Sequence, residues 1–89
     1  MQYKNKISEA NSIRLFVYNV PKRFSVDDIY GHISYLGIDV KDLRQSSHRD
    51  ARRKSFVVKI PRDKARFFSE DETIERLNIR VREYNDRSD

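Results

Sequence analysis

The chain has 89 residues, which suits one small domain, and its 19 Lys and Arg against 14 Asp and Glu give a net charge of +5. It contains no Cys, which excludes disulfides and cysteine-based zinc sites. No apolar run approaches the roughly 20 residues that span a bilayer, and no signal peptide is recognisable. We therefore expect an intracellular protein without membrane contact, in either the nucleus or the cytoplasm.

The positive charge is concentrated in one segment. Residues 41–54 contain six basic and two acidic residues, a net charge of +4, whereas acidic residues gather between positions 70 and 75. A field polarised in this way orients a polyanion on approach. A solvated loop that keeps the protein soluble explains the same charge, so composition alone leaves both interpretations open.

The first two predicted elements are a strand and a helix. Residues 1–11 lack periodicity and are expected to form a flexible lead-in. Residues 13–18 alternate as a strand with aliphatic residues on one face and with Arg14, Phe16 and Tyr18 on the other, and Pro21 ends the run. Ser25 and Asp28 have the spacing of a capping box, so a helix should follow. Its apolar positions are Val26, Ile29, Tyr30, Ile33 and Leu36, and Gly37 is a suitable left-handed terminator.

The second half of the chain is predicted to form two strands, a short helix and a last strand. A strand is predicted over residues 38–44, a basic connection over 45–53, and a third strand over 55–60, which Pro61 ends. A short helix should cover residues 62–69 with Ala65, Phe67 and Phe68 inward, followed by an acidic loop. A last strand over residues 78–84 should place Ile79, Val81 and Glu83 on one face and Arg80, Arg82 and Tyr84 on the other. Residues 86–89 are expected to form a C-terminal tail.

The element order β-α-β-β-α-β predicts an α+β fold over residues 12–85. The expected architecture is a ferredoxin-like sandwich, a four-stranded antiparallel sheet with two helices on one face. The other face should be open to solvent and carry Arg14, Phe16, Tyr18, Ser55, Val57, Arg80, Arg82 and Tyr84. Aromatic residues on such a face can stack unpaired bases, while arginines neutralise phosphates. Simple cross-strand pairing of the aromatics is the alternative explanation.

Residues 15–20, with the sequence Leu-Phe-Val-Tyr-Asn-Val, resemble the strand-one ribonucleoprotein motif of RNA recognition motif (RRM) domains. All six positions fit that motif's pattern of aliphatic, aromatic, aliphatic, any residue, Asn and aliphatic. A capped helix follows at the expected distance, and the element order agrees over residues 13–84. The resemblance implies that Phe16 is the base-stacking aromatic of strand one.

The second RRM motif, on strand three, departs from the family pattern. The octamer aligns with residues 53–60, and Arg53 fits its basic first position. Ser55 and Val57, however, stand where the family carries aromatics. A shift by one residue would align Phe56 with an aromatic position but would send Lys59 into the core, so we reject the shifted register. The sheet therefore has half the usual stacking platform.

A finer resemblance concerns the two C-terminal strands. Residues 55–61 and 79–84 are similar to the end of RRM-like domains in Gag-like, first-open-reading-frame proteins of retrotransposons. Those domains help package element RNA and often precede zinc knuckles. A knuckle is excluded in this chain because it has no Cys.

The sequence offers no set of residues typical of catalysis. His32 is predicted on the polar side of its helix and His48 in the basic connection, and neither has a partner at metal-ligand spacing. No phosphate-cradling glycine loop is recognisable, and residues 46–48 lack the setting of a hydrolase triad. We therefore expect no enzyme activity, no cofactor, no metal and no small-molecule substrate.

Two kinds of partner fit these patterns. The first is single-stranded RNA, with Phe16 and Tyr18 stacking bases beside Tyr84. Phosphates would be held by two groups of cations, Arg14, Arg80 and Arg82 on the sheet and Arg49, Arg52, Arg53 and Lys54 in the loop before strand three. The second is a protein docked on the sheet or helix face, with Val57, Phe16 and Tyr18 as a small apolar hot spot. Duplex or DNA binding through the basic loop alone is a third hypothesis.

Overall fold

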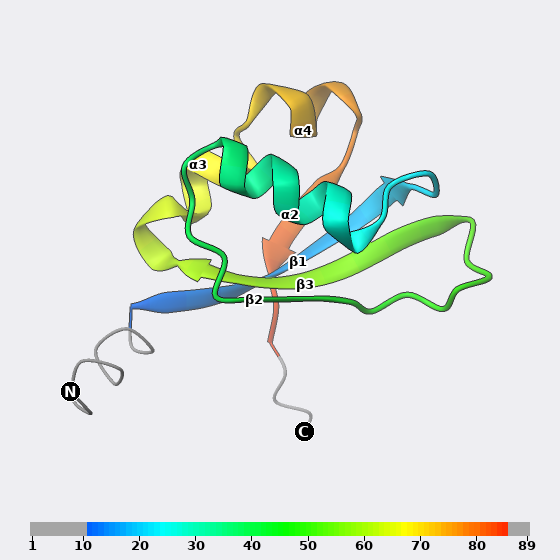
Figure 1. The fold of residues 1–89 in the computed structure, drawn as a ribbon, viewed down its shortest axis with the longest axis horizontal. Coiled ribbons are helices and arrows are strands. Elements are labelled where there is room, and N and C mark those ends of the chain that lie inside the picture. The colour runs from blue at the N-terminus through cyan, green and yellow to red at the C-terminus, as the bar shows by residue number, and fades with distance from the viewer. Residues whose placement is uncertain (1–10, 86–89) are drawn as a thin grey trace.

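The computed structural model describes residues 11–85, which form an α+β domain with one four-stranded antiparallel sheet (Figure 1). The predicted lead-in, apart from Asn11, and the predicted tail lie outside these residues. The elements in chain order are β1 (Ser12–Pro21), α2 (Val26–Tyr35), β2 (Asp42–Gln45), β3 (Arg53–Pro61), the 3-10 turn η1 (Arg62–Lys64), α3 (Ala65–Ser69), α4 (Glu72–Arg76) and β4 (Arg80–Glu83).

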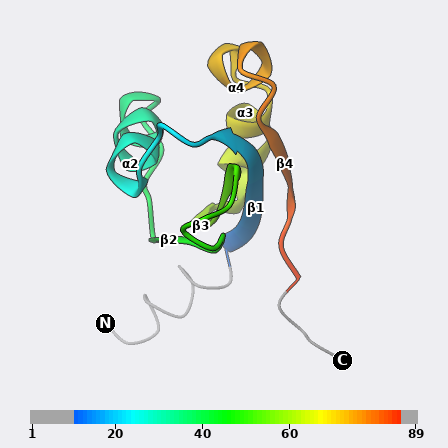
Figure 2. The ribbon, with the colours of Figure 1, turned by 90° about the vertical axis from the view of Figure 1, so that its right-hand side faces the viewer.

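The strands lie side by side in the order β2-β3-β1-β4, so the longest strands, β1 and β3, form the centre of the sheet. The helices all lie on one side of this sheet, and no described segment covers the other side (Figure 1). Figure 2 shows α2 on the β2 side of the molecule and α4 on the β4 side. No helix within residues 11–85 has the length and apolar character needed to cross a membrane.

The two central strands have the predicted faces. Leu15 and Val17 of β1, together with Phe56, Val58 and Ile60 of β3, are at most 4 % exposed and face the helices. Burial of side chains of this size contributes roughly 1.5–3 kcal/mol each. The register chosen from the sequence for strand three is therefore confirmed. The rest of the buried core is Val20, Ile29, Ile33, Ile38, Phe68, Ile74 and Ile79.

β1 is longer than predicted, because it continues to Pro21 through a β-bulge. The register with β3 shifts between Val17 and Val20, and Asn19 within the bulge has a φ of 60°. Asn tolerates this left-handed conformation better than most side chains. The bulge lets Val20 reach the core, where it is fully buried.

Helix α2 has the predicted ends. The Oγ atom of Ser25 accepts a hydrogen bond from the backbone N–H of Asp28, whose carboxylate accepts one from the backbone N–H of Ser25. At the other end Gly37 has a φ of 80°, and the N–H of Ile38 donates to the carbonyl of Ile33. Of the predicted apolar stripe, Tyr30 is the exception, since it is 52 % exposed.

The second strand and the second helical region differ from the prediction. The strand predicted over residues 38–44 is the shorter β2, Asp42–Gln45. Ile38 still closes the end of α2, and backbone bonding to β3 begins where the N–H of Lys41 donates to the carbonyl of Lys59. The acidic segment is not a loop, since Asp71 caps a further helix, α4, which buries Ile74. Phe68 is buried as predicted, but Phe67 is 53 % exposed.

Candidate nucleic-acid interface

Three aromatic rings form a continuous row on the open face of the sheet. Phe16 and Tyr18 are two residues apart on β1, so their side chains leave the strand on the same face. Their ring centroids are 5.3 Å apart, and the ring of Tyr84 follows 6.1 Å from that of Phe16. The backbone N–H of Tyr84 donates to the carbonyl of Arg14, which holds the residue after β4 against β1. The rings are stacked rather than dispersed over the sheet.

Arg82 lies over this row. It is the register partner of Phe16 on β4, and the central carbon of its guanidinium is 5.0 Å from the Phe16 ring centroid and 5.7 Å from that of Tyr18. A guanidinium in this position is attracted by the negative faces of the rings. The planar guanidinium and the rings beneath it are both surfaces of the kind on which unpaired bases stack.

Val57 occupies the middle of the same face but cannot contact a ligand directly. Its register partners are Phe16 on one side and Arg44 on the other, and Val57 is only 4 % exposed. The expectation that Val57 offers an exposed apolar contact is therefore wrong. As the register partner of Phe16, Val57 lies beside that residue on the same face of the sheet.

Ser55 stands two residues before Val57 and is half-buried on the open face. Its Oγ atom lies 2.8 Å from the Oγ atom of Ser46 at the start of the β2–β3 connection. With Ser55 and Val57 lacking rings, all three stacking residues come from β1 and the end of β4.

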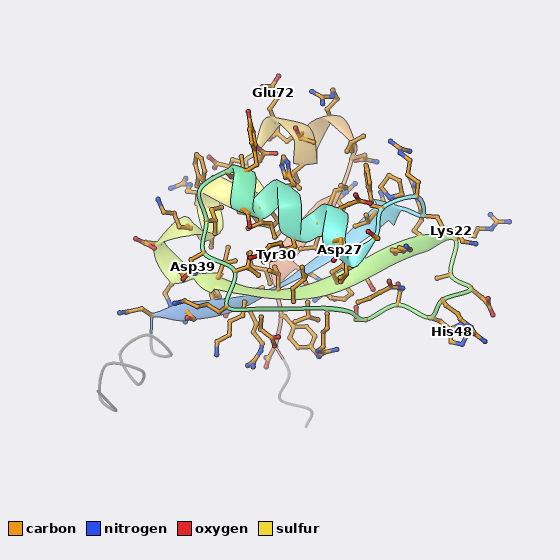
Figure 3. All side chains as sticks on the ribbon, viewed as in Figure 1. Lys22, Asp27, Tyr30, Asp39, His48 and Glu72 are labelled. Atoms are coloured by element: carbon orange, nitrogen blue, oxygen red, sulfur yellow. The ribbon has the colours of Figure 1, made fainter. Side chains whose placement is uncertain are left out.

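Basic residues gather at the end of the sheet where β1 and β2 finish. Arg49, Arg52 and Arg53 are exposed there, as predicted. Figure 3 places Lys22, after β1, and His48, in the β2–β3 connection, at this same end. Sequence reasoning missed Lys22 and its neighbour Arg23, which are exposed directly after Pro21, the last residue of β1.

Lys54 has a different role from the one predicted. Its Nζ atom donates a 2.7 Å hydrogen bond to the carbonyl of Phe24, just before α2. Lys54 shares its strand face with Phe56, so its side chain leaves β3 on the helix side. Lys54 therefore joins the start of β3 to the loop before α2 rather than facing a ligand on the open sheet.

Arg14 and Arg80 mark the two ends of the aromatic row. Arg80 is the register partner of Tyr18, and Arg14 is the register partner of Lys59 on β3. Both arginines are exposed. A polyanion lying along the row would thus meet cationic side chains at each end.

On the helix side, His32 has a partner that the sequence did not reveal. Its Nε2 atom lies 2.8 Å from Oδ2 of Asp71, which also accepts hydrogen bonds from the N–H groups of Thr73 and Ile74. Burial acts to raise the pKa of Asp71, but the hydrogen bond with His32 and those from the backbone outweigh it and lower the pKa below its ordinary value of 3.8. The sequence analysis looked only for partners of His32 at metal-ligand spacing, and Asp71 is 39 residues away along the chain.

The His32–Asp71 pair borders a small apolar hollow between α2 and α4. The hollow measures about 120 Å³ and is lined by Phe24, Asp28, Ile29, His32, Thr73, Ile74, Leu77 and Ile79. Over the described range 11–85, no three His, Asp or Glu side chains converge in a way that could hold a metal ion.

The structure brings most of the predicted contact residues onto one surface. That surface consists of Arg14, Phe16, Tyr18, Arg80, Arg82 and Tyr84 on the sheet, with Arg49, Arg52 and Arg53 at its end. Val57 lies beneath it and Lys54 behind it. Comparison with protein-family models, curated proteins and solved structures found no match for this chain. The geometry of this surface is therefore the basis on which a function is assigned.

Proposed function

We propose that this protein binds single-stranded RNA on the open face of its sheet, without catalysis. The observation that carries the proposal is the stacked row of Tyr18, Phe16 and Tyr84 on the face opposite the helices. Stacking of an unpaired base on an aromatic ring contributes about 1–3 kcal/mol. Phe16, Tyr18 and Tyr84 are each half-buried, so part of every ring stays open to a ligand on the face that no helix covers.

The arginines add an electrostatic component to this stacking. Arg80 and Arg14 flank the row, Arg82 lies over it, and the basic loop extends the positive surface beyond Tyr18. A single strand exposes both its bases and its phosphates, whereas a duplex keeps its bases stacked internally. Three adjacent rings fit two or three consecutive nucleotides.

The fold supports assigning this protein to the RRM-like class. The strand order β2-β3-β1-β4 with the helices on one face is compatible with a ferredoxin-like sandwich. The motif-like residues 15–20 lie on the central strand β1, with Phe16 in the middle of the aromatic row. The relationship to retrotransposon Gag-like proteins remains a prediction from sequence resemblance.

The stacking contribution can be tested by measuring the anisotropy of labelled single-stranded oligoribonucleotides. The F16A/Y18A double variant should bind at least tenfold more weakly, as expected from the loss of about 1–3 kcal/mol per stacked base. Tyr30→Ala is the matched control, because Tyr30 is an exposed aromatic on the helix side. Unchanged affinity of a folded F16A/Y18A variant would refute the proposal.

Protein docking on the sheet is a weaker alternative in view of the geometry. The docking hypothesis relied on apolar contacts of Val57, Phe16 and Tyr18. Val57 is only 4 % exposed, and the rings of Phe16 and Tyr18 lie under the charged guanidinium of Arg82. Amide shift mapping with RNA distinguishes the hypotheses. Amide shifts at Phe16 and Tyr84 would support stacking. Shifts confined to residues 49–54 would support nonspecific electrostatic binding. In that case, competition with double-stranded RNA and with DNA would show which nucleic acids the basic loop binds.

A further inference from the structure

A shallow hollow lies where β1 begins and β3 ends, next to the last ring of the aromatic row. It measures about 190 Å³ and is lined by Ser12, Ile13, Arg14, Lys59, Arg62, Glu83 and Tyr84. The hollow is distinct from the basic loop, which lies at the opposite end of β1. The hollow therefore lies next to Tyr84, at the end of the ring row on which we propose that RNA stacks.

Three cationic side chains from separate elements meet at this hollow. Arg14 on β1 and Lys59 on β3 are register partners, so their side chains leave the open face side by side. Arg62 is the first residue of η1, directly after β3. The pairing of β1 with β3 fixes the backbone positions of Arg14 and Lys59, and Arg62 follows β3 directly.

The backbone around β1 fixes the position of Arg62. Its N–H donates to the carbonyl of Asn11 at 2.6 Å, and its Nη2 atom donates to the carbonyl of Ser12 at 3.2 Å. A guanidinium has five N–H donors in a planar fork, and the bond to Ser12 uses one of them. An arginine anchored in this way loses less entropy on binding an anion than a mobile one.

The one acidic residue of the lining leaves the sheet on the opposite side. Glu83 is the register partner of Leu15, a core residue that faces the helices. Side chains of residues directly opposite each other on paired strands lie on the same face, so the side chain of Glu83 leaves β4 on the helix side. Arg14, Lys59 and Arg62 outnumber the single acidic residue in the lining of the hollow.

We propose that this hollow is a phosphate subsite, formed by Arg14, Lys59 and Arg62, for the nucleotide next to the one that stacks on Tyr84. The inference rests on the proposed RNA binding and deepens it. Charge-assisted hydrogen bonds from guanidinium and ammonium groups are the strong contacts that phosphates make in proteins. The phosphate is either the terminal phosphate of a strand or an internal phosphate of a longer one.

The test uses trinucleotides, which match the three rings, with hydroxyl ends, a 5′-phosphate or a 3′-phosphate. A phosphate at one end should raise affinity about tenfold, the size expected of a hydrogen bond between charged groups. A phosphate at the other end should add little. Extending the trinucleotide by one nucleotide at the favoured end should give the same gain if the subsite also accepts an internal phosphate.

Arg62→Gln should remove the gain while leaving the affinity of the hydroxyl-ended trinucleotide unchanged. Arg66→Gln is the matched control, because Arg66 is an exposed arginine on α3 whose loss changes the net charge equally. Equal gains at both ends that survive in the R62Q variant would mean nonspecific attraction and overturn the subsite. The absence of any gain from a bound trinucleotide would overturn it as well.

A second readout separates this inference from the proposed function. If the hydroxyl-ended trinucleotide does not bind, stacking fails, and titration with inorganic phosphate then decides the subsite alone. Amide shifts at Lys59 and Arg62 that exceed those at Arg49 and Arg52 would support it. Equal or larger shifts at the basic loop would overturn it.

Discussion

The side-chain amide of Asn19 donates a 2.8 Å hydrogen bond to the backbone carbonyl of Asn78. Both residues have a φ of 60°, and they are 59 positions apart. The bond joins the bulge of β1 to the turn that leads into β4. It therefore helps to set the register in which Arg82 reaches Phe16 and Tyr84 returns beside Arg14.

Replacing Asn19 should separate the two contributions of this side chain. N19G keeps the left-handed backbone accessible but removes the hydrogen bond, so it should lower the free energy of unfolding by about 0.5–1.5 kcal/mol. N19A adds the cost of a left-handed conformation, a further ~1–2 kcal/mol. Urea unfolding of both variants measures the difference. Equal stability of N19A and N19G would contradict the assigned strain.

The pair of His32 and Asp71 should make the free energy of unfolding fall at low pH. The pKa of Asp71 is lowered in the folded protein, so its contribution is fully present above the unfolded value of 3.8 and is lost as the pH falls through the folded value. D71N keeps a competent helix cap but removes the charge. At pH 7 this variant should be less stable than the wild type by roughly 1–2 kcal/mol.

At pH 3 the gap between D71N and the wild type should narrow, because this pH is below 3.8 and the Asp71 carboxylate of the unfolded chain is then largely protonated. Glu72→Gln is the control, since Glu72 is an exposed acid in the first turn of the same helix. Its unfolding free energy should follow that of the wild type closely at both pH values. A D71N deficit that is unchanged between pH 7 and pH 3 would show that packing, not charge, holds Asp71.

Elements with local signals could be predicted from the sequence. The faces of β1 and β3 follow from unbroken alternation, and both ends of α2 are fixed by residues within a few positions of each other. Helix α4 was missed because it has only five residues and depends on its Asp71 cap and on the burial of Ile74. The Asp cap followed by acidic first-turn residues was the available signal.

The sequence was sufficient to predict on which face of the sheet each site residue lies, but not which residues it contacts. Phe16 and Tyr18 share a face on any straight strand, and the structure places them there. The burial of Val57, however, depends on Phe16 and Arg44 in neighbouring strands. The partner of Lys54 is 30 residues away, and that of His32 is 39 residues away. Such pairings follow from tertiary packing, which local periodicity does not encode.

Adding a ring at Ser55 should strengthen RNA binding. Ser55 is on the open face, half-buried, at a position where RRM domains carry an aromatic. S55Y should extend the stacking platform and lower the dissociation constant at least fivefold, a gain of about 1 kcal/mol for one additional base. V57Y is the contrasting variant, because that site is covered by neighbours. It should cost about 1–3 kcal/mol of stability through overpacking and bring no such gain.

Oligonucleotide titrations and urea unfolding measure these two effects independently. A folded S55Y variant whose RNA affinity equals that of the wild type would argue against stacking on this part of the sheet. The hydrogen bond between the Oγ atoms of Ser55 and Ser46 is lost in that variant. S55A, which loses the bond without adding a ring, is therefore its reference.

The exposed arginines of the β2–β3 connection should determine how steeply RNA binding falls with salt. Each phosphate neutralised on a single strand contributes about −0.7 to the slope of log affinity against log salt. The R49Q/R52Q double variant should therefore have a slope shallower by about 1.4, with the base-stacking part retained. R66Q/R76Q, which removes the same charge from exposed positions on α3 and α4, should keep the wild-type slope. Equal slopes for the two double variants would mean that net charge, and not the position of Arg49 and Arg52, governs the attraction of RNA.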